Sequence, residues 1–141
     1  MQTNILSECD KAALELEAGI VSNDPTRLIN FYSRVFGFDT ISSFSADAGT
    51  VYKLRGGKAR LKIFAPRRNP QRNAEEPLGV REGLCYMALY VSDVDRSLAQ
   101  AVAEEATVLS PPTSHRPGAT MAMIRDPDGN IIELLQDQSP R

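Results

Sequence analysis

The stretch IRDPDGNIIELLQ (residues 124–136) decides much of the fold, because a run of turn-forming residues stands directly before an alternating strand. The run DPDGN (126–130) favours a tight turn, since proline fixes φ and glycine or asparagine accepts a positive φ. Two strands are therefore predicted to meet there as a hairpin. The second strand places Ile131, Glu133 and Leu135 on one face. A carboxylate on a mostly apolar strand needs a partner or a function.

Another alternating strand is predicted near the start of the chain, where residues 14–21 read LELEAGIV. Such alternation is typical of a strand with one face in a core. The opposite face carries Glu15 and Glu17. The predicted core face carries Leu14, Leu16, Ala18 and Ile20.

A helix is predicted to follow this first strand. Asp24 suits the N-cap, and Pro25 suits the first helical position, where no amide donor is needed. Gly37 suits the C-terminal end, where the backbone turns left-handed. The predicted apolar stripe consists of Leu28, Phe31, Tyr32 and Val35. Three strands are expected next, near residues 38–44, 50–55 and 59–64, the last two joined by Gly56 and Gly57.

The same order of elements recurs in the second half of the chain. The predicted strand LCYMALYV (84–91) is followed by Asp93 as an N-cap. Because neighbouring side chains on a strand point to opposite faces, Cys85 is expected to face the helix and Tyr86 to point away from it. The second apolar stripe consists of Val94, Leu98, Ala101 and Val102. Strands are expected near residues 107–109, 119–124 and 131–136, with a loop at 111–120. Each half is thus a βαβββ unit, which is too small to bury its apolar face alone.

The predicted fold class is α+β, with two βαβββ modules in one domain. The expected segments are an N-terminal tail (1–12), a first module (13–64), a connector (65–83), a second module (84–136) and a C-terminal tail (137–141). The connector is rich in proline, glycine and charge. Its charged residues are expected to be solvated, although a connector of this length could also cover the mouth of a pocket.

Composition excludes several classes of protein. An apolar fraction of 42% in 141 residues is enough for a buried core, and a formal net charge of −2 gives no basic surface for nucleic acid. The longest apolar run is too short to span a membrane. The first residues carry no secretory signal, so a cytoplasmic protein is expected. Cys9 and Cys85 lack the spacing of a disulfide framework or a cysteine metal site.

The internal repeat, FYSRVFGF (31–38) and RDPDGNIIEL (125–134) together resemble the vicinal oxygen chelate superfamily. This superfamily includes glyoxalase I, the bleomycin-resistance proteins, fosfomycin-resistance enzymes and extradiol dioxygenases. The resemblance implies curved mixed sheets that enclose a cavity, and it implies a homodimer. In metal-dependent members the first and last strands of each module each give one ligand, commonly His or Gln on the first and Glu on the last.

At the four corresponding positions this chain carries Glu17, Lys62, Tyr86 and Glu133, of which only Glu133 is a usual ligand type. A phenol binds a divalent ion poorly unless it is ionised. The decisive departure is Lys62, because an ammonium has three donors and no lone pair. The prediction is therefore no tightly bound metal, with Lys62 pairing electrostatically with the acids. A divalent ion at Glu17 and Glu133 is the alternative.

Other residues are predicted to line the same cavity. Arg60 and Phe64 share the face of Lys62, and Tyr90 shares the face of Tyr86. His115 and Arg116 lie in the loop that borders the last hairpin. Each of these residues also has a plainer interpretation, which is core packing for the aromatic side chains and solvent exposure for the loop residues.

The sequence favours a protein that binds a small organic molecule, such as an antibiotic or an aromatic metabolite, in a cavity without a tightly bound metal. The rival interpretation is a lyase, isomerase or dioxygenase of the same superfamily. In a metal-free enzyme, Glu133 would accept a proton while Lys62 or Tyr86 stabilised an oxyanion. In the metal-dependent alternative, the enzyme would hold a divalent ion in an unusual oxygen-rich site. A scaffold role has no support beyond the charged connector.

Overall fold

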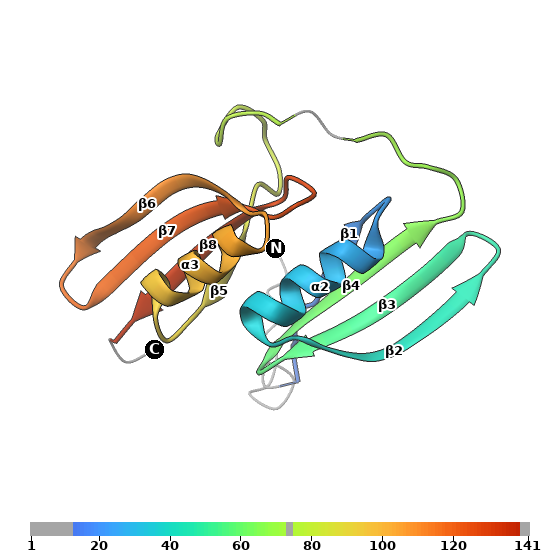
Figure 1. Cartoon of the computed structure of the whole chain (residues 1–141), viewed down its shortest axis with the longest axis horizontal. Coiled ribbons are helices and arrows are strands. Elements are labelled where there is room, and N and C mark those ends of the chain that lie inside the picture. The colour runs from blue at the N-terminus through green and yellow to red at the C-terminus, as the bar shows by residue number, and fades with distance from the viewer. Residues whose placement is uncertain (1–12, 73–74, 139–141) are drawn as a thin grey trace, which may run out of the picture.

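The computed structural model describes residues 13–72 and 75–138 and consists of two βαβββ modules (Figure 1). The expected tail at residues 1–12 and the last three residues lie outside this part of the chain. The first module contains β1 (Ala18–Val21), α2 (Pro25–Phe36), β2 (Asp39–Ala46), β3 (Gly49–Gly56) and β4 (Ala59–Pro66). The second contains β5 (Met87–Tyr90), α3 (Val94–Ala103), β6 (Thr107–Arg116), β7 (Ala119–Arg125) and β8 (Ile131–Asp137).

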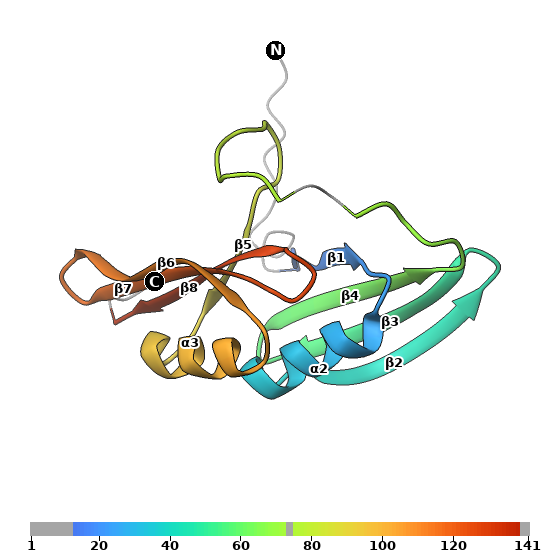
Figure 2. The same ribbon diagram turned by 45° about the horizontal axis from the view of Figure 1, so that its top comes forward.

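Each module forms a four-stranded mixed sheet with the same topology. The strand orders are β1-β4-β3-β2 and β5-β8-β7-β6, in which the first strand of each module pairs parallel to the last. The two helices lie side by side on the same side of the sheets (Figure 2) and contact each other. The opposite face of both sheets, called the open face here, is left uncovered by the helices. The α+β class and the repeated βαβββ order are confirmed.

Local capping signals explain why both helices begin where they do. Asp24 Oδ1 accepts a hydrogen bond from Arg27 N at 3.1 Å, and Asp93 Oδ1 accepts one from Arg96 N at 3.1 Å. Gly37 ends α2 at a φ of 75°, in the left-handed region. The predicted stripe of α2 is fully confirmed, since all four of its side chains are buried: Leu28, Phe31, Tyr32 and Val35.

The core lies between the helices and the covered faces of both sheets. Leu61 and Ile63 of β4 contribute from the first module, and Ile132 and Leu134 of β8 contribute from the second. Because these strands stand in equivalent positions, the two modules bury their apolar faces in one shared cluster. No helix in the described ranges is long and apolar enough to cross a membrane.

Four predicted core positions are wrong, because two strands begin later than expected and one helical position faces solvent. Pairing of β1 with β4 begins at Ala18, so Leu14 and Leu16 precede the strand and are 82% and 88% exposed. Cys85 precedes β5 and is exposed rather than packed under the helix. In α3, Ala101 occupies the buried position, and the next residue, Val102, is turned toward solvent and 51% exposed.

The expected loop at residues 111–120 is also wrong, because β6 continues through Pro111 and Pro112 to Arg116. Proline lacks an amide donor, and it is tolerated here because β6 is an edge strand with no partner on one side. The pairing of β6 with β7 shifts register repeatedly between Val108 and Arg116. At the other hairpin, Gly56 ends β3, so the turn before β4 consists of residues 57–58.

Candidate functional site

The parallel strand pairs place two of the predicted site residues at equivalent points of the two modules. Lys62 of β4 lies opposite Gly19 of β1, and Glu133 of β8 lies opposite Ala88 of β5. Both residues stand between buried neighbours on their own strands. Since neighbouring side chains on a strand point to opposite faces, Lys62 and Glu133 project from the open face.

On the open face of the first module, two acids and two cations form a connected cluster. Lys62 Nζ lies 3.1 Å from Glu17 Oε1. Arg60 Nη2 lies 2.6 Å from Glu15 Oε2, and Arg60 Nε lies 3.9 Å from Glu17 Oε2. The side chain of Glu17 is only 26% exposed, whereas that of Lys62 is 46% exposed. Glu17 is therefore held between two cations, while Lys62 keeps access to solvent.

This arrangement does not fit a metal site of the superfamily type. Lys62 Nζ stands beside the Glu17 carboxylate, where a cation would meet a positive charge instead of a lone pair. Among the described residues, no three His, Cys, Asp or Glu side chains are grouped closely enough to hold a metal ion. The four positions thus supply two carboxylates but no imidazole, and an ammonium accompanies them, which does not match the ligand sets that zinc or iron sites use.

The second module presents its predicted residues without such a cluster. Glu133 is half-buried, and within the described ranges its side chain forms no hydrogen bond or ion pair. Tyr86 directly precedes β5 and is 44% exposed. Of the three residues predicted to act together in a metal-free enzyme, Lys62 pairs instead with Glu17, and among the described residues no hydrogen bond or ion pair joins it to Glu133 or Tyr86.

The other predicted lining residues separate in space. Phe64 is half-buried on β4, on the same face as Lys62. Tyr90 is 52% exposed at the end of β5 and lines a different cavity, near the start of α3. Arg116 forms an ion pair with Asp137 at the end of β8. His115 belongs to β6, and its side chain lies outside what the structure describes.

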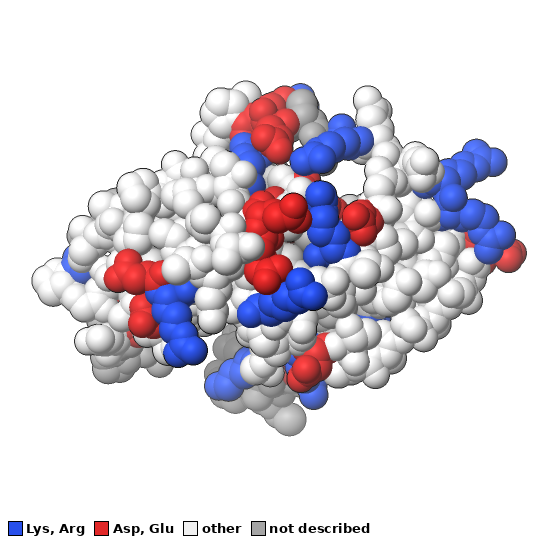
Figure 3. All heavy atoms as spheres, in the orientation of Figure 1, with Lys and Arg blue, Asp and Glu red and all other residues white. Residues whose placement is uncertain are grey.

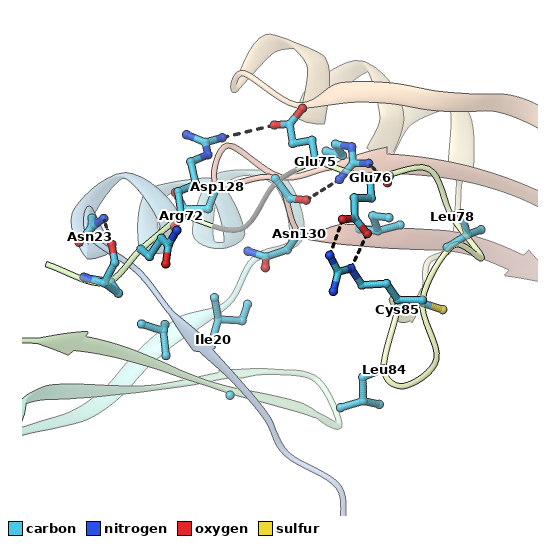
Figure 4. Close-up of a pocket in the computed structure, with 18 of the residues that line it drawn as sticks. Ile20, Asn23, Arg72, Glu75, Glu76, Leu78, Leu84, Cys85, Asp128 and Asn130 are labelled. Atoms are coloured by element: carbon cyan, nitrogen blue, oxygen red, sulfur yellow. Dashed lines mark hydrogen bonds and ion pairs between the residues drawn. The ribbon is translucent and has the colours of Figure 1, made fainter.

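Part of the connector lines a cavity at the junction of the modules, which bears on the alternative in which the connector covers the mouth of a pocket. A cavity of about 550 Å³, called the connector cavity here, lies between β1, the start of α2, the turn at 126–130 and the segment 70–85 (Figure 4). Ile20 and Leu84 contribute apolar surface, and Glu75, Glu76 and Arg72 contribute charged walls. None of Glu17, Lys62, Tyr86 or Glu133 lines this cavity.

The charged side chains around the connector cavity satisfy one another. Arg81 Nε lies 2.6 Å from Glu76 Oε2, and Arg72 Nη2 lies 3.4 Å from Glu75 Oε1. Arg125 Nη2 donates to the carbonyl oxygen of Glu76 at 2.6 Å, which ties the connector to β7. Acidic and basic side chains accordingly lie next to one another where the connector crosses the two modules (Figure 3). No unbalanced charge is left there for an ionic ligand.

A buried network that the sequence did not predict joins the turn at 126–130 of the second module to α2. Tyr32 Oη donates to Asp126 Oδ2 at 2.8 Å, and Asn130 Nδ2 donates to the same oxygen at 2.9 Å. Burial raises the pKa of Asp126, and these hydrogen bonds offset part of that effect. Burial also raises the pKa of Tyr32 well above its ordinary value, and the neighbouring carboxylate adds to the rise. One signal was available, because a buried tyrosine hydroxyl needs a partner.

Asp128 completes this junction from the same turn. Its carboxylate accepts a hydrogen bond from Ser22 Oγ at 2.6 Å and one from Arg27 Nη2 at 3.2 Å. Arg27 Nη2 also donates to the carbonyl oxygen of Pro127 at 2.9 Å. The turn identified from the sequence therefore makes a polar contact between the two modules.

The superfamily profile described as "Glyoxalase/Bleomycin resistance protein/Dioxygenase superfamily" matches residues 15–134, which is most of the chain. The chain belongs to this superfamily. No curated protein matches the chain. The superfamily assignment agrees with the repeated βαβββ order and with the predicted resemblance.

Solved structures show the same fold at low sequence identity. A glyoxalase family protein from Bacillus cereus superposes with a TM-score of 0.78 at 15% identity and covers 99% of both chains. TioX from Micromonospora sp. ML1 gives a TM-score of 0.63 at 22% identity, covering 88% of this chain and 98% of that one. Glyoxalase I from Zea mays gives a TM-score of 0.69 at 20% identity over 89% of this chain. This superfamily member spans only 45% of the Zea mays chain.

Proposed function

We propose that this protein binds a small organic molecule on the open face of its sheets, without a tightly bound metal ion. The supporting observation is the 3.1 Å contact between Lys62 Nζ and Glu17 Oε1 at two of the positions that hold metal ligands elsewhere in the superfamily. An ammonium there supplies positive charge and hydrogen-bond donors to an oxygen atom of the ligand. Phe64 supplies aromatic surface two residues along β4 on the same face, and Tyr86 supplies exposed aromatic surface just before β5.

The partial exposure of Lys62 supports a role toward a ligand. Glu17 forms ion pairs with both Lys62 and Arg60, and an ammonium has three donors, so Lys62 retains donors for a ligand. The structural pairing stabilises the protein only modestly, because exposed ion pairs contribute about 0.2–1 kcal/mol. An antibiotic or an aromatic metabolite has the size and the mixed polarity that such a surface accepts.

We also propose that a second copy of the chain covers the open face. Large apolar side chains are exposed on and beside it, including Val21 at 54%, Leu84 at 106% and Tyr86 at 44%. A contiguous exposed apolar surface marks an interaction site. A homodimer would bury these side chains and enclose the ligand, and the absence of a spanning helix among described residues is consistent with a cytoplasmic location.

A metal-free lyase or isomerase is the second candidate, and one observation favours it. The Glu133 carboxylate is half-buried and has no hydrogen-bond partner among the described side chains, so it is available to accept a proton. In this reaction Glu133 removes a proton from the substrate, and Lys62 or Tyr86 stabilises the negative oxygen that forms.

A thermal-shift screen of aromatic antibiotics and metabolites, followed by product analysis, tests the proposal. If the protein binds without reaction, at least one compound should raise the melting temperature of the wild type. The same compound should have little effect on Lys62→Met, and product analysis should recover it chemically unchanged. A failure of every compound to stabilise the protein, or equal stabilisation of Lys62→Met, would contradict the binding role of Lys62. If Glu133→Gln retains ligand affinity but abolishes turnover of a compound, the enzyme interpretation replaces simple binding.

A further inference from the structure

A second cavity, of about 650 Å³, lies on another part of the module junction. It is bounded by the C-terminal end of α2, the turn at 57–58, the end of β5 and the first turns of α3. We call it the α2–α3 cavity. It shares no lining residue with the connector cavity, and it contains none of Glu17, Lys62 or Glu133. Its volume falls within the range of small-molecule sites.

One wall of the α2–α3 cavity is apolar and firmly held. Phe38 is 3% exposed and packs edge-on against Tyr32 with a centroid separation of 5.8 Å. A Cβ placed on Gly56 would lie 3.0 Å from Phe38 Cγ, so the hairpin backbone rests directly against the ring. Val35 and Leu89 extend this wall. A wall with such close contacts exists before any ligand arrives.

The rim of the α2–α3 cavity carries two cations that the protein leaves unpaired. Within the described ranges, neither Lys58 nor Arg96 forms a side-chain ion pair or hydrogen bond. Asp93 is the one acid among the described lining residues, and its side chain is already engaged with the Arg96 amide at 3.1 Å as the cap of α3. The connector cavity differs, because there Arg72 and Arg81 are paired with Glu75 and Glu76.

We propose that the α2–α3 cavity binds a small molecule in which an anionic group is joined to an aromatic body. The aromatic body would pack on the wall formed around Phe38, and the anionic group would meet Lys58 and Arg96 at the rim. Placing an anion there gives both cations the partner they lack, whereas an uncharged ligand would gain only the apolar contact. This site is separate from the proposed site at Lys62 and does not depend on it.

Two fluorescent probes test the proposal, since both share a phenyl-naphthylamine body and only one carries a negative charge. The anionic probe is 1-anilino-8-naphthalenesulfonate, and the neutral probe is N-phenyl-1-naphthylamine. The anionic probe should bind the wild type with higher affinity. Lys58→Met and Arg96→Met should each weaken that binding about two- to fivefold, as expected for exposed charge pairs, and the double variant should weaken it about tenfold. Affinity for the neutral probe should change less than twofold.

Matched variants control for a general effect of removing positive charge. Arg72→Met and Arg81→Met remove cations at the connector cavity and should leave the affinity of the anionic probe unchanged, and Lys58→Arg should retain wild-type affinity. The proposal is overturned if the anionic probe binds the Lys58 and Arg96 variants as tightly as the wild type. It is also overturned if the Arg72 variant weakens binding equally. Because both single variants alter exposed side chains, they keep the test decisive even if the double variant unfolds.

Discussion

At position 62 the chain carries an ammonium, which has hydrogen-bond donors but no lone pair to offer a metal ion. Lys62 is positioned between buried residues of a central strand, so its backbone placement is fixed by the core and only its side chain chemistry is free to vary. The 3.1 Å contact with Glu17 then follows from pairing of β4 with β1. A single residue thus changes the electrostatics of a surface whose architecture is otherwise retained.

Asp126 illustrates a second residue-scale effect, which is the effect of burial on a carboxyl group. Its pKa is raised above the ordinary value of 3.8 because burial disfavours the charged form. A folded-state pKa above the unfolded value means that folding favours the protonated acid. The resulting contribution to stability is present below pH 3.8 and is lost as the pH rises through the raised pKa.

Asp126→Asn separates this titration from the rest of the protein, since the amide has similar size and does not titrate. The free energy of unfolding of the wild type relative to the variant should fall as the pH rises from below 3.8 through the raised pKa. Urea denaturation at several pH values measures the difference. A wild-type advantage that grows with pH across this window would show that the pKa is lowered instead.

At the scale of elements, the sequence was most informative where the signal was local. Asp24, Asp93 and Gly37 each mark a helix end through contacts within a few residues, and all three were placed correctly. Strand ends depend on partners far along the chain, which is why β1 begins at Ala18 and β6 runs through two prolines. Edge position and register could not be read from the alternation alone.

The same distinction applies to the candidate site. The open-face positions of Lys62 and Glu133 were predicted because strand periodicity is local. The contact between Tyr32 and Asp126 was missed because it joins residues on different modules, and the local sequence around each residue does not identify its partner. The charged residues of the connector were expected to be solvated, and the ion pairs among them were likewise not predicted.

Capping gives a prediction at the element scale. Asp93→Ala removes the acceptor for the Arg96 amide and should lower the free energy of unfolding by about 1 kcal/mol. Asp93→Asn retains a capping oxygen and should cost only a few tenths of that amount. Chemical denaturation of the three proteins measures both values. Equal losses in the two variants would mean that the charge, rather than the cap, stabilises α3.

At the scale of the whole molecule, the two modules are equivalent in topology but not in their polar contacts. Arg27 and Arg96 stand at the same position of the repeat, three residues after the helix cap. Only Arg27 reaches the other module, where it donates to Asp128 and to the carbonyl of Pro127. The turn at 126–130 thereby joins the modules through one copy of a repeated residue.

This asymmetry predicts different costs for the same substitution. Arg27→Met removes two charge-assisted hydrogen bonds across the junction and should lower the free energy of unfolding by about 1–3 kcal/mol. Arg96→Met removes no side-chain hydrogen bond or ion pair among the described residues and should change this free energy by less than about 0.5 kcal/mol. Thermal and urea denaturation provide the comparison. Similar losses for both variants would contradict the assigned role of the turn in joining the two modules.

The central claim is that positive charge on the open face replaces the metal chemistry of the superfamily, and the metal content of the purified protein tests it most directly. After dialysis without chelator and addition of zinc, manganese, nickel or iron(II), elemental analysis should find well below one equivalent per chain, and the melting temperature should not rise. A stoichiometric divalent ion that is lost when Glu17 and Glu133 are replaced by Gln, and that raises the melting temperature, would contradict the claim.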